Sequence, residues 1–356
     1  MVPVQGEGSR VPQSYFTPIR LCLAFFVAFE HVFYFQAGEA NSPFELGHTS
    51  LGYFAVNGFF ILSGYLITGS AERSANVLVF ARSRLLRIMP ALIFIALLLG
   101  LVVVPLLSKP DLASYYSDGA LWSAIAKLST FIDPYPQWPT LLMEGNPFEL
   151  DRDMTGPIWT LRFEVLAYLG TAGLLLVGLH RNIPIILLGA AATTLLFVFD
   201  LQTHRLTELN GTLASLVRFG SCYLYGAAAY LLADRARIKS LFALPVLLIG
   251  AVLIALGIAS GEVLMNLALT PILFAIAFSS VKAPEWVSKP PDFSYGLYIF
   301  HWPIYQVLTE TVSRPPNGTL LFLVGLPLAI IAAIASWYLL EKPMLKLKAA
   351  AAYRPD

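Results

Sequence analysis

Long apolar runs dominate the chain and predict its architecture. A transmembrane helix needs about 20 mostly apolar residues, and continuous runs of this kind indicate helices rather than the alternating strands of a barrel. Such runs lie at 19–36, 49–68, 88–107, 157–178, 182–200, 213–232, 240–258, 263–281, 293–311 and 319–341. We therefore expect an all-α, polytopic membrane protein with about ten transmembrane helices.

Lysine and arginine are unevenly distributed among the segments that connect these runs. With the N-terminus in the cytoplasm, the inner segments hold 16 of the 23 basic residues, as the positive-inside rule requires. We expect both termini to be cytoplasmic, with an N-terminal segment (1–18), one membrane domain (19–341) and a C-terminal tail (342–356). The first run lacks a small-residue cleavage site, so we expect a retained helix rather than a signal peptide.

The longest connection, 108–156, is then an outer loop rich in acidic and aromatic residues. The stretch 120–131 has helical periodicity and predicts a helix on the membrane surface. Trp122 or Trp138 could stack on a sugar, although a tryptophan near a membrane more often anchors the interface.

Composition narrows the function classes. The chain is 57% hydrophobic and only 13% charged, whereas soluble chains carry about 25% charged residues. This excludes a cytosolic enzyme, a nucleic-acid-binding protein and a disordered scaffold. The two cysteines, Cys22 and Cys222, cannot form a disulfide framework or a CxxC site. No zinc-binding spacing is present either, so we expect no metal.

A few ionisable side chains fall inside the apolar runs, where each costs at least a few kcal/mol and is a functional candidate. They are Glu30, His31, Arg162, Glu164, Arg218 and His301. Arg20 and His31 are eleven residues apart, which places them on one helix face, separated by about 16 Å along the axis. Arg20 then lies at the inner surface and His31 just past mid-membrane. Taken alone, Arg20 is explained by its guanidinium reaching the lipid phosphates, and His31 by a hydrogen bond to a backbone carbonyl. Their position on one helix face favours a functional role for the pair.

Two arginines one helical turn apart, Arg84 and Arg87, precede Pro90 on the inner side. They could clamp a polyanionic cytosolic ligand such as a phosphoadenosine cofactor. Anchoring by the positive-inside rule competes about equally with this interpretation.

Three further runs carry candidate polar groups. The run 49–68 holds Asn57 and Ser63 beside Gly58 and Gly64, and small residues there are also typical of close helix packing. Trp159 and Glu164 open the run 157–178, where Arg162 could form a structural ion pair. In the run 293–311, Ser294, Tyr298 and His301 share one face. That face predicts a polar cavity or, alternatively, an aromatic belt.

The order of six short motifs along the chain is more specific than any one of them. They are Arg-x10-His from 20, Phe-Phe-x2-Ser-Gly-x-Leu from 59, Arg-x2-Arg-Ile-x-Pro from 84, Trp-Thr-Leu-x2-Glu from 159, Ser-Tyr-x2-Tyr-x2-His-x-Pro from 294 and Glu-Lys-Pro from 341. From about residue 15 to 345 the chain resembles the acyltransferase-3 family of integral membrane acyltransferases. Some members also carry a C-terminal esterase-like domain, which has no counterpart in this sequence.

The resemblance implies a ten-helix domain in the bacterial cytoplasmic (inner) membrane. Such a domain takes an acyl group, commonly acetyl from acetyl-CoA, and delivers it to a hydroxyl of an extracytoplasmic or lipid-linked saccharide. It implies that His31 is the essential histidine with Arg20 as its partner, that Arg84 and Arg87 form the motif associated with the acyl donor, and that Trp159, Glu164, Tyr298 and His301 belong to two further site motifs. We therefore expect catalytic roles for His31, Glu164 and His301, contacts of Arg20, Arg84 and Arg87 with the CoA phosphates, and acceptor contacts for Trp159, Tyr298, Ser63 and Asn57. His31 would act either as a general base or as a transient acyl carrier.

Two other functions remain as alternatives. A secondary transporter or a flippase of lipid-linked saccharides would also use many helices and buried charges, without acyl chemistry. Transporters commonly show inverted repeats, and no such duplication is evident in this sequence. An acyltransferase acting on protein or lipid is disfavoured by the order of the motifs.

Overall fold

The computed structural model describes residues 15–37, 45–47, 49–139, 154–232, 243–279, 281–312 and 317–352. All regular elements within these ranges are helices, and one isolated bridge joins Leu46 to Thr49. This confirms the all-α class. Three parts of the sequence-based expectations lie outside the described residues. They are the ends of both expected cytoplasmic segments, the connection expected at 233–239 and the acidic stretch 144–153 of the outer loop.

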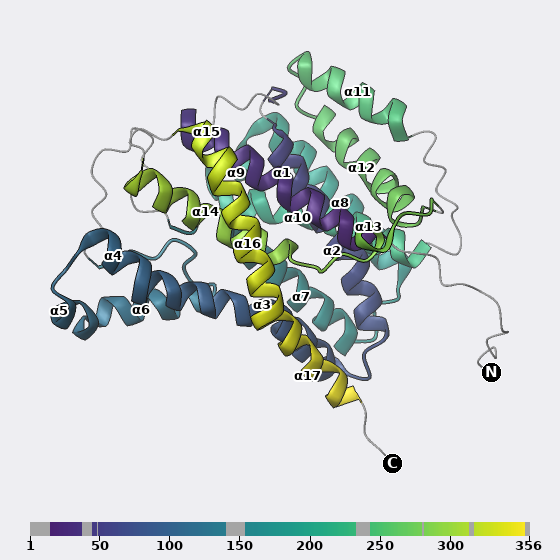
Figure 1. Ribbon diagram of the computed structural model, residues 1–356. Coiled ribbons are helices and arrows are strands. Elements are labelled where there is room, and N and C mark those ends of the chain that lie inside the picture. The colour runs from purple at the N-terminus through teal and green to yellow at the C-terminus, as the bar shows by residue number, and fades with distance from the viewer. Residues whose placement is uncertain are drawn as a thin grey trace.

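Each expected run contains helix, and several runs are interrupted (Figure 1). The longer helices are α1 (Phe16–Ala37), α2 (Leu51–Glu72), α3 (Val77–Leu98), α6 (Gly119–Ser129), α7 (Leu161–Leu176), α8 (Ile183–Thr203), α10 (Gly211–Leu232), α11 (Ala243–Ala255), α12 (Gly261–Ala277), α14 (Ser294–Thr311), α16 (Leu326–Ser336) and α17 (Lys342–Ala352). The short ones are α4 (Val104–Ser108), α5 (Leu112–Ser117), α9 (Arg205–Leu209), α13 (Glu285–Ser288) and α15 (Gly318–Leu320). One-turn π-helical segments at Leu99–Val103, Leu321–Gly325 and Trp337–Glu341 link neighbouring helices, and a 3₁₀ turn, Gly156–Thr160, leads into α7.

Six helical stretches in the described residues are long and apolar enough to cross a membrane. They are Phe16–Gln36, Leu51–Glu72, Val77–Ser108, Gly156–Leu176, Ile183–Thr203 and Gly318–Leu347. α11 and α12 are apolar but shorter. α14 buries His301, Gln306 and Thr309, because its neighbours are protein segments rather than lipid. The chain is therefore a multi-pass membrane protein.

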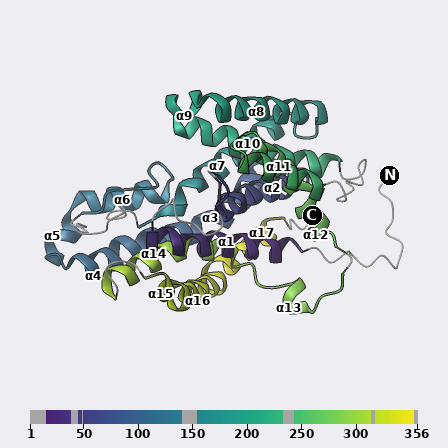
Figure 2. The same ribbon diagram turned by 90° about the horizontal axis from the view of Figure 1, so that it is seen from above.

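The central helices pack in a continuous row. α8 contacts α10, α10 contacts α2, α2 contacts α1, α1 contacts α14 and α14 contacts α16. Figure 2 shows α8 at one edge of this row and α16 at the other. A Cβ on Gly64 of α2 would lie 1.9 Å from the Tyr223 carbonyl oxygen, and one on Gly226 of α10 would lie 1.8 Å from that of Ile61. The prediction that Gly64 permits close helix packing is confirmed.

The outer loop begins after α4 with α5 and α6, and α6 folds back along α3 (Figure 1). The helix expected at 120–131 forms as α6, and it buries Leu121 and Leu128. Trp138 is buried beside Gly100 and therefore cannot stack on a sugar, whereas Trp122 is half-exposed and donates its indole N–H to the Tyr116 carbonyl. Among the described residues of this loop, Tyr135 lines a cavity, which is described below.

Candidate active site

The two intramembrane histidines meet at the contact between α1 and α14. His31 Nδ1 lies 2.7 Å from His301 Nε2, and the two rings stack with their centroids 5.0 Å apart. His301 is fully buried, and Trp302 lies edge-on to the His31 ring at 4.9 Å. The residues at the middle of the first and ninth expected runs therefore form one unit.

The hydrogen bonds of this pair fix which nitrogens carry protons. His301 Nδ1 lies 2.9 Å from the Leu297 carbonyl oxygen, which can only accept, so this nitrogen is protonated. In neutral His301 the other nitrogen, Nε2, is then an acceptor. His31 must donate to it from Nδ1. The Nε2 lone pair of His31 is left free to act as a base or a nucleophile.

His31 lines an outer cavity of about 370 Å³ between α1, α2, α10, α14 and the 3₁₀ turn before α7. Its wall is aromatic and polar, and it includes Trp159, Tyr298, Tyr53 and Arg218. Trp159 is held in place by edge contact with Phe163. Cavities of this size, lined by aromatic rings with a few polar groups, are typical of small-molecule sites.

Glu30, whose partner the sequence does not indicate, also lines the outer cavity. Its carboxylate accepts a hydrogen bond from the Gly52 amide at 3.4 Å, in the first turn of α2, where Ser50 caps the helix. The positive end of a helix dipole favours a carboxylate at this position. Glu30 thus links α1 to α2 and does not contact the imidazole of His31 through any recorded bond.

A second, inner cavity of about 60 Å³ is lined by Arg20, Ser63 and Glu164, among others. It shares Val56, Thr160 and Tyr298 with the outer cavity. The hydroxyls of Thr160 and Tyr298 lie 2.7 Å apart and both approach the Pro157 carbonyl. This hydroxyl pair, with Val56, forms the partition between the two cavities.

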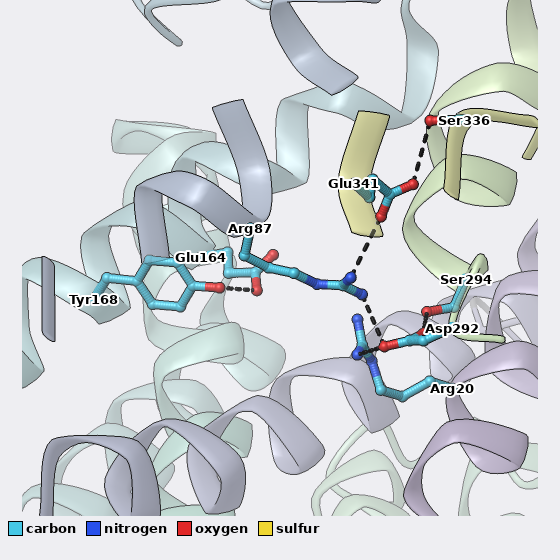
Figure 3. A network of polar contacts seen from close by, with 8 residues as sticks. All are labelled: Arg20, Arg87, Glu164, Tyr168, Asp292, Ser294, Ser336 and Glu341. Carbon is cyan, nitrogen blue, oxygen red and sulfur yellow. Dashed lines mark hydrogen bonds and ion pairs between the residues drawn. The ribbon is translucent and has the colours of Figure 1, made fainter. Parts of the chain in front are cut away.

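Beside the inner cavity, four of the sequence motifs converge on a buried network of ion pairs (Figure 3). Arg20 and Arg87 both donate to Asp292, at 2.5 and 2.9 Å, and Arg87 also reaches Glu341 at 3.3 Å. Ser294 donates to Asp292, and Ser336 donates to Glu341. Burial would raise the pKa of the Asp292 carboxyl, but the guanidinium groups of Arg20 and Arg87 lower that pKa to about 2.

The sequence does not reveal Asp292 as part of this site. It lies in a mixed-charge connection between two apolar runs, where a carboxylate normally faces solvent. Its position could have indicated a role in the site. Asp292 lies two residues before the motif that begins at Ser294, on the cytoplasmic side, to which Arg20 and Arg87 were also assigned.

The three arginines expected to clamp a donor do not act as a single group. Arg20 and Arg87 share Asp292, whereas Arg84 donates to the hydroxyls of Ser83 and Ser70 and lies 5.8 Å from the ring of Tyr168. In the described part of the chain no carboxylate pairs with Arg84. Of the three side chains, Arg84 is thus the one whose charge remains available to an anion.

The other candidate residues are placed apart from the histidine pair. Glu164 accepts from Tyr168 at 2.5 Å and lines the inner cavity, so the partition separates it from His31. Ser63 lines the inner cavity with it. Asn57 is buried against Asn266 of α12 at 3.0 Å, and it is not part of the wall of either cavity.

Comparison with known proteins assigns the chain to a family. The model of an acyltransferase domain matches residues 14–340. The chain belongs to the acyltransferase-3 family. It is similar to an O-acetyl transferase from Shigella phage Sf6, with 24% identity over 330 residues, which cover 93% of this chain and 95% of that protein. No solved structure matches. The protein is therefore a membrane acyltransferase, and acyl transfer is favoured over transport without chemistry.

Proposed function

We propose that this protein transfers an acetyl group from acetyl-CoA on the cytoplasmic side of a bacterial inner membrane to a hydroxyl of a saccharide on the outer side. The proposal includes ten membrane spans with both termini in the cytoplasm. The observation that carries it is the histidine pair, which leaves one imidazole lone pair unused on His31, a residue that lines the outer cavity.

The contacts between connecting segments support the assignment of these segments to two opposite sides. Arg181, from a short connection assigned to the cytoplasm, pairs with Glu72 at the cytoplasmic end of α2, at 3.1 Å. Residues from two connections assigned to the outside, Glu45 and Tyr135, line the outer cavity together. Segments with the same assignment thus meet on the same side of the helix row.

The outer cavity has the properties of a saccharide site. Its aromatic wall, with Trp159 and Tyr53, offers flat apolar surfaces for sugar rings, while Glu30 and the hydroxyls of Thr160 and Tyr298 offer hydrogen-bonding groups. The donor is assigned to the opposite side. The inner cavity of about 60 Å³ is too small for a nucleotide, so the phosphates would remain at the cytoplasmic mouth near Arg84. The acyl-bearing end of the donor would then approach the partition.

The chemistry follows from the protonation state of His31. As a general base, its free nitrogen removes the proton of the acceptor hydroxyl while the oxygen attacks the thioester carbonyl. The tetrahedral intermediate then collapses, the C–S bond breaks and the thiolate leaves with that proton. His301 holds the His31 ring in the required tautomer, as the carboxylate does in hydrolase triads. The same lone pair can alternatively accept the acyl group itself before passing it to the acceptor.

Substitution of His31 tests the proposal. His31→Gln keeps a hydrogen-bonding side chain but removes both basicity and nucleophilicity. We expect no release of free CoA above background with acceptor present, at normal protein yield and with unchanged donor binding. Retained turnover in this variant would refute the proposal. A covalent acyl label retained by the wild type without acceptor, and absent in His31→Gln, would identify the acyl-carrier route.

A further inference from the structure

Arg218 of α10 is a charged side chain in the outer cavity that the transfer chemistry does not use. It lines the same cavity as His31. Its Nε atom is inaccessible to solvent and has no hydrogen-bond partner. No hydrogen bond or ion pair of the guanidinium with a described residue is recorded, and its neighbours are the aromatic rings discussed next.

The guanidinium is nevertheless held in place. It lies 4.0 Å from the ring centroid of Tyr53 and 4.2 Å from that of Phe219. Tyr53 is fixed in turn by a 2.5 Å hydrogen bond to Glu262, which is fully buried. Phe219 stacks on Phe60 at 4.3 Å. Aromatic faces stabilise the cation but leave its N–H donors unused.

Such an arrangement is costly unless a ligand completes it. Arginine stays protonated in proteins and presents five N–H donors in a planar fork. A partly buried fork without acceptors loses its hydration and gains no bond in return. The geometry that suits this fork best is an oxyanion, either a carboxylate or a phosphate, bound through two parallel hydrogen bonds.

We propose that Arg218 binds an anionic group of the acceptor, so that the substrate is an acidic saccharide: a sugar bearing a carboxylate or a phosphate. This inference rests on the proposed function, because it takes the outer cavity as the acceptor site. The hydroxyl to be acylated then faces His31, and the anionic group is anchored at Arg218 on α10.

The test compares three probes on the purified full-length protein in nanodiscs. Binding of glucuronic acid, glucose 1-phosphate and glucose is measured by calorimetry and by thermal shift. We expect at least one of the two anions to bind about 10- to 100-fold more tightly than glucose, since a charged hydrogen bond is lost without it. The tighter of the two anions distinguishes a carboxylate from a phosphate on the acceptor.

Two arginine variants locate the effect. Arg218→Gln should abolish the preference for the anion and leave glucose binding unchanged. Arg162→Gln is the matched control, because Arg162 also lies over an aromatic ring, at 5.0 Å from Phe163, but is absent from the walls of both cavities. It should keep the preference.

Equal affinity of the wild type for the three probes, including no binding of any, overturns the inference. So does a preference that survives in Arg218→Gln. Because the wild-type comparison stands alone, a variant that fails to fold does not remove the test. His31→Gln separates the two proposals. If it retains turnover while the anion preference depends on Arg218, the proposed catalytic role fails and this inference holds.

Discussion

Removal of the Arg87 side chain should destabilise the protein mainly through Glu341. The Glu341 side chain is only 1% exposed, and without Arg87 its one remaining recorded partner is the Ser336 hydroxyl at 3.2 Å. The Asp292 carboxylate is destabilised less, because it retains its ion pair with Arg20 at 2.5 Å. Breaking a buried ion pair from one side costs about 3–5 kcal/mol, since the other charge is left uncompensated. We expect Arg87→Met to approach this range.

A double-mutant cycle isolates the pair. Glu341→Gln removes the buried charge, so the double variant Arg87→Met/Glu341→Gln should be more stable than Arg87→Met alone. The coupling between the two sites should be about 2–3 kcal/mol, at the upper end of values for residues in contact. Thermal unfolding of the purified protein, compared with denaturant titrations on the same samples, measures it.

Arg82→Met is the control, because Arg82 lies on the same helix and is exposed. It should leave the unfolding transition unchanged. The reasoning is refuted if Arg87→Met unfolds like the wild type, or if the two single effects simply add in the double variant. In either case Arg87 would not be the counter-charge of a buried carboxylate.

Three further predictions follow from other contacts. His301→Phe removes the acceptor for His31 Nδ1–H. A positioned general base contributes a rate enhancement of about 10²–10⁴-fold, and we expect the variant to lose much of it. The rate of CoA release at normal protein yield measures this loss. Gly64→Ala should lower the melting temperature, because its Cβ would meet a backbone oxygen 1.9 Å away, whereas Gly170→Ala, with open space around it, should not. Because the pKa of Asp292 is depressed to about 2, its stabilising contribution should be full above about pH 4 and be lost as pH falls towards 2. Melting curves of the wild type and Asp292→Asn against pH test this, and an acid limb unchanged by Asp292→Asn would contradict it.

The fold class and the shared face of Arg20 and His31 could be predicted, because helix periodicity and bilayer length leave few choices. The pairing of His31 with His301 could not, since 270 residues separate them and helix adjacency is decided by packing. Asp292 illustrates the same limit. A carboxylate in a connecting segment is expected to be solvated, and only the assembled bundle shows that it neutralises two arginines.

Hydropathy alone does not identify every helix that builds the site. α10 and α14 have 22 and 18 residues but are not among the stretches that are apolar enough to cross a membrane. They nevertheless carry Arg218 at the outer cavity and His301 of the histidine pair. Helices surrounded by other helices need less apolar surface, so the segments that contribute most to the site give the weakest hydropathy signal.

The hydroxyl pair of Thr160 and Tyr298 has a bioenergetic consequence. An enzyme that hands a group from one face of an energised membrane to the other needs a route through the bilayer, and an open, water-filled route would dissipate the proton gradient. In this structure the two cavities meet at a wall of Val56 and two hydroxyls 2.7 Å apart. In the transfer proposed above, this contact would keep the two cavities apart between turnovers, and a movement of these side chains would open the way for the acetyl group.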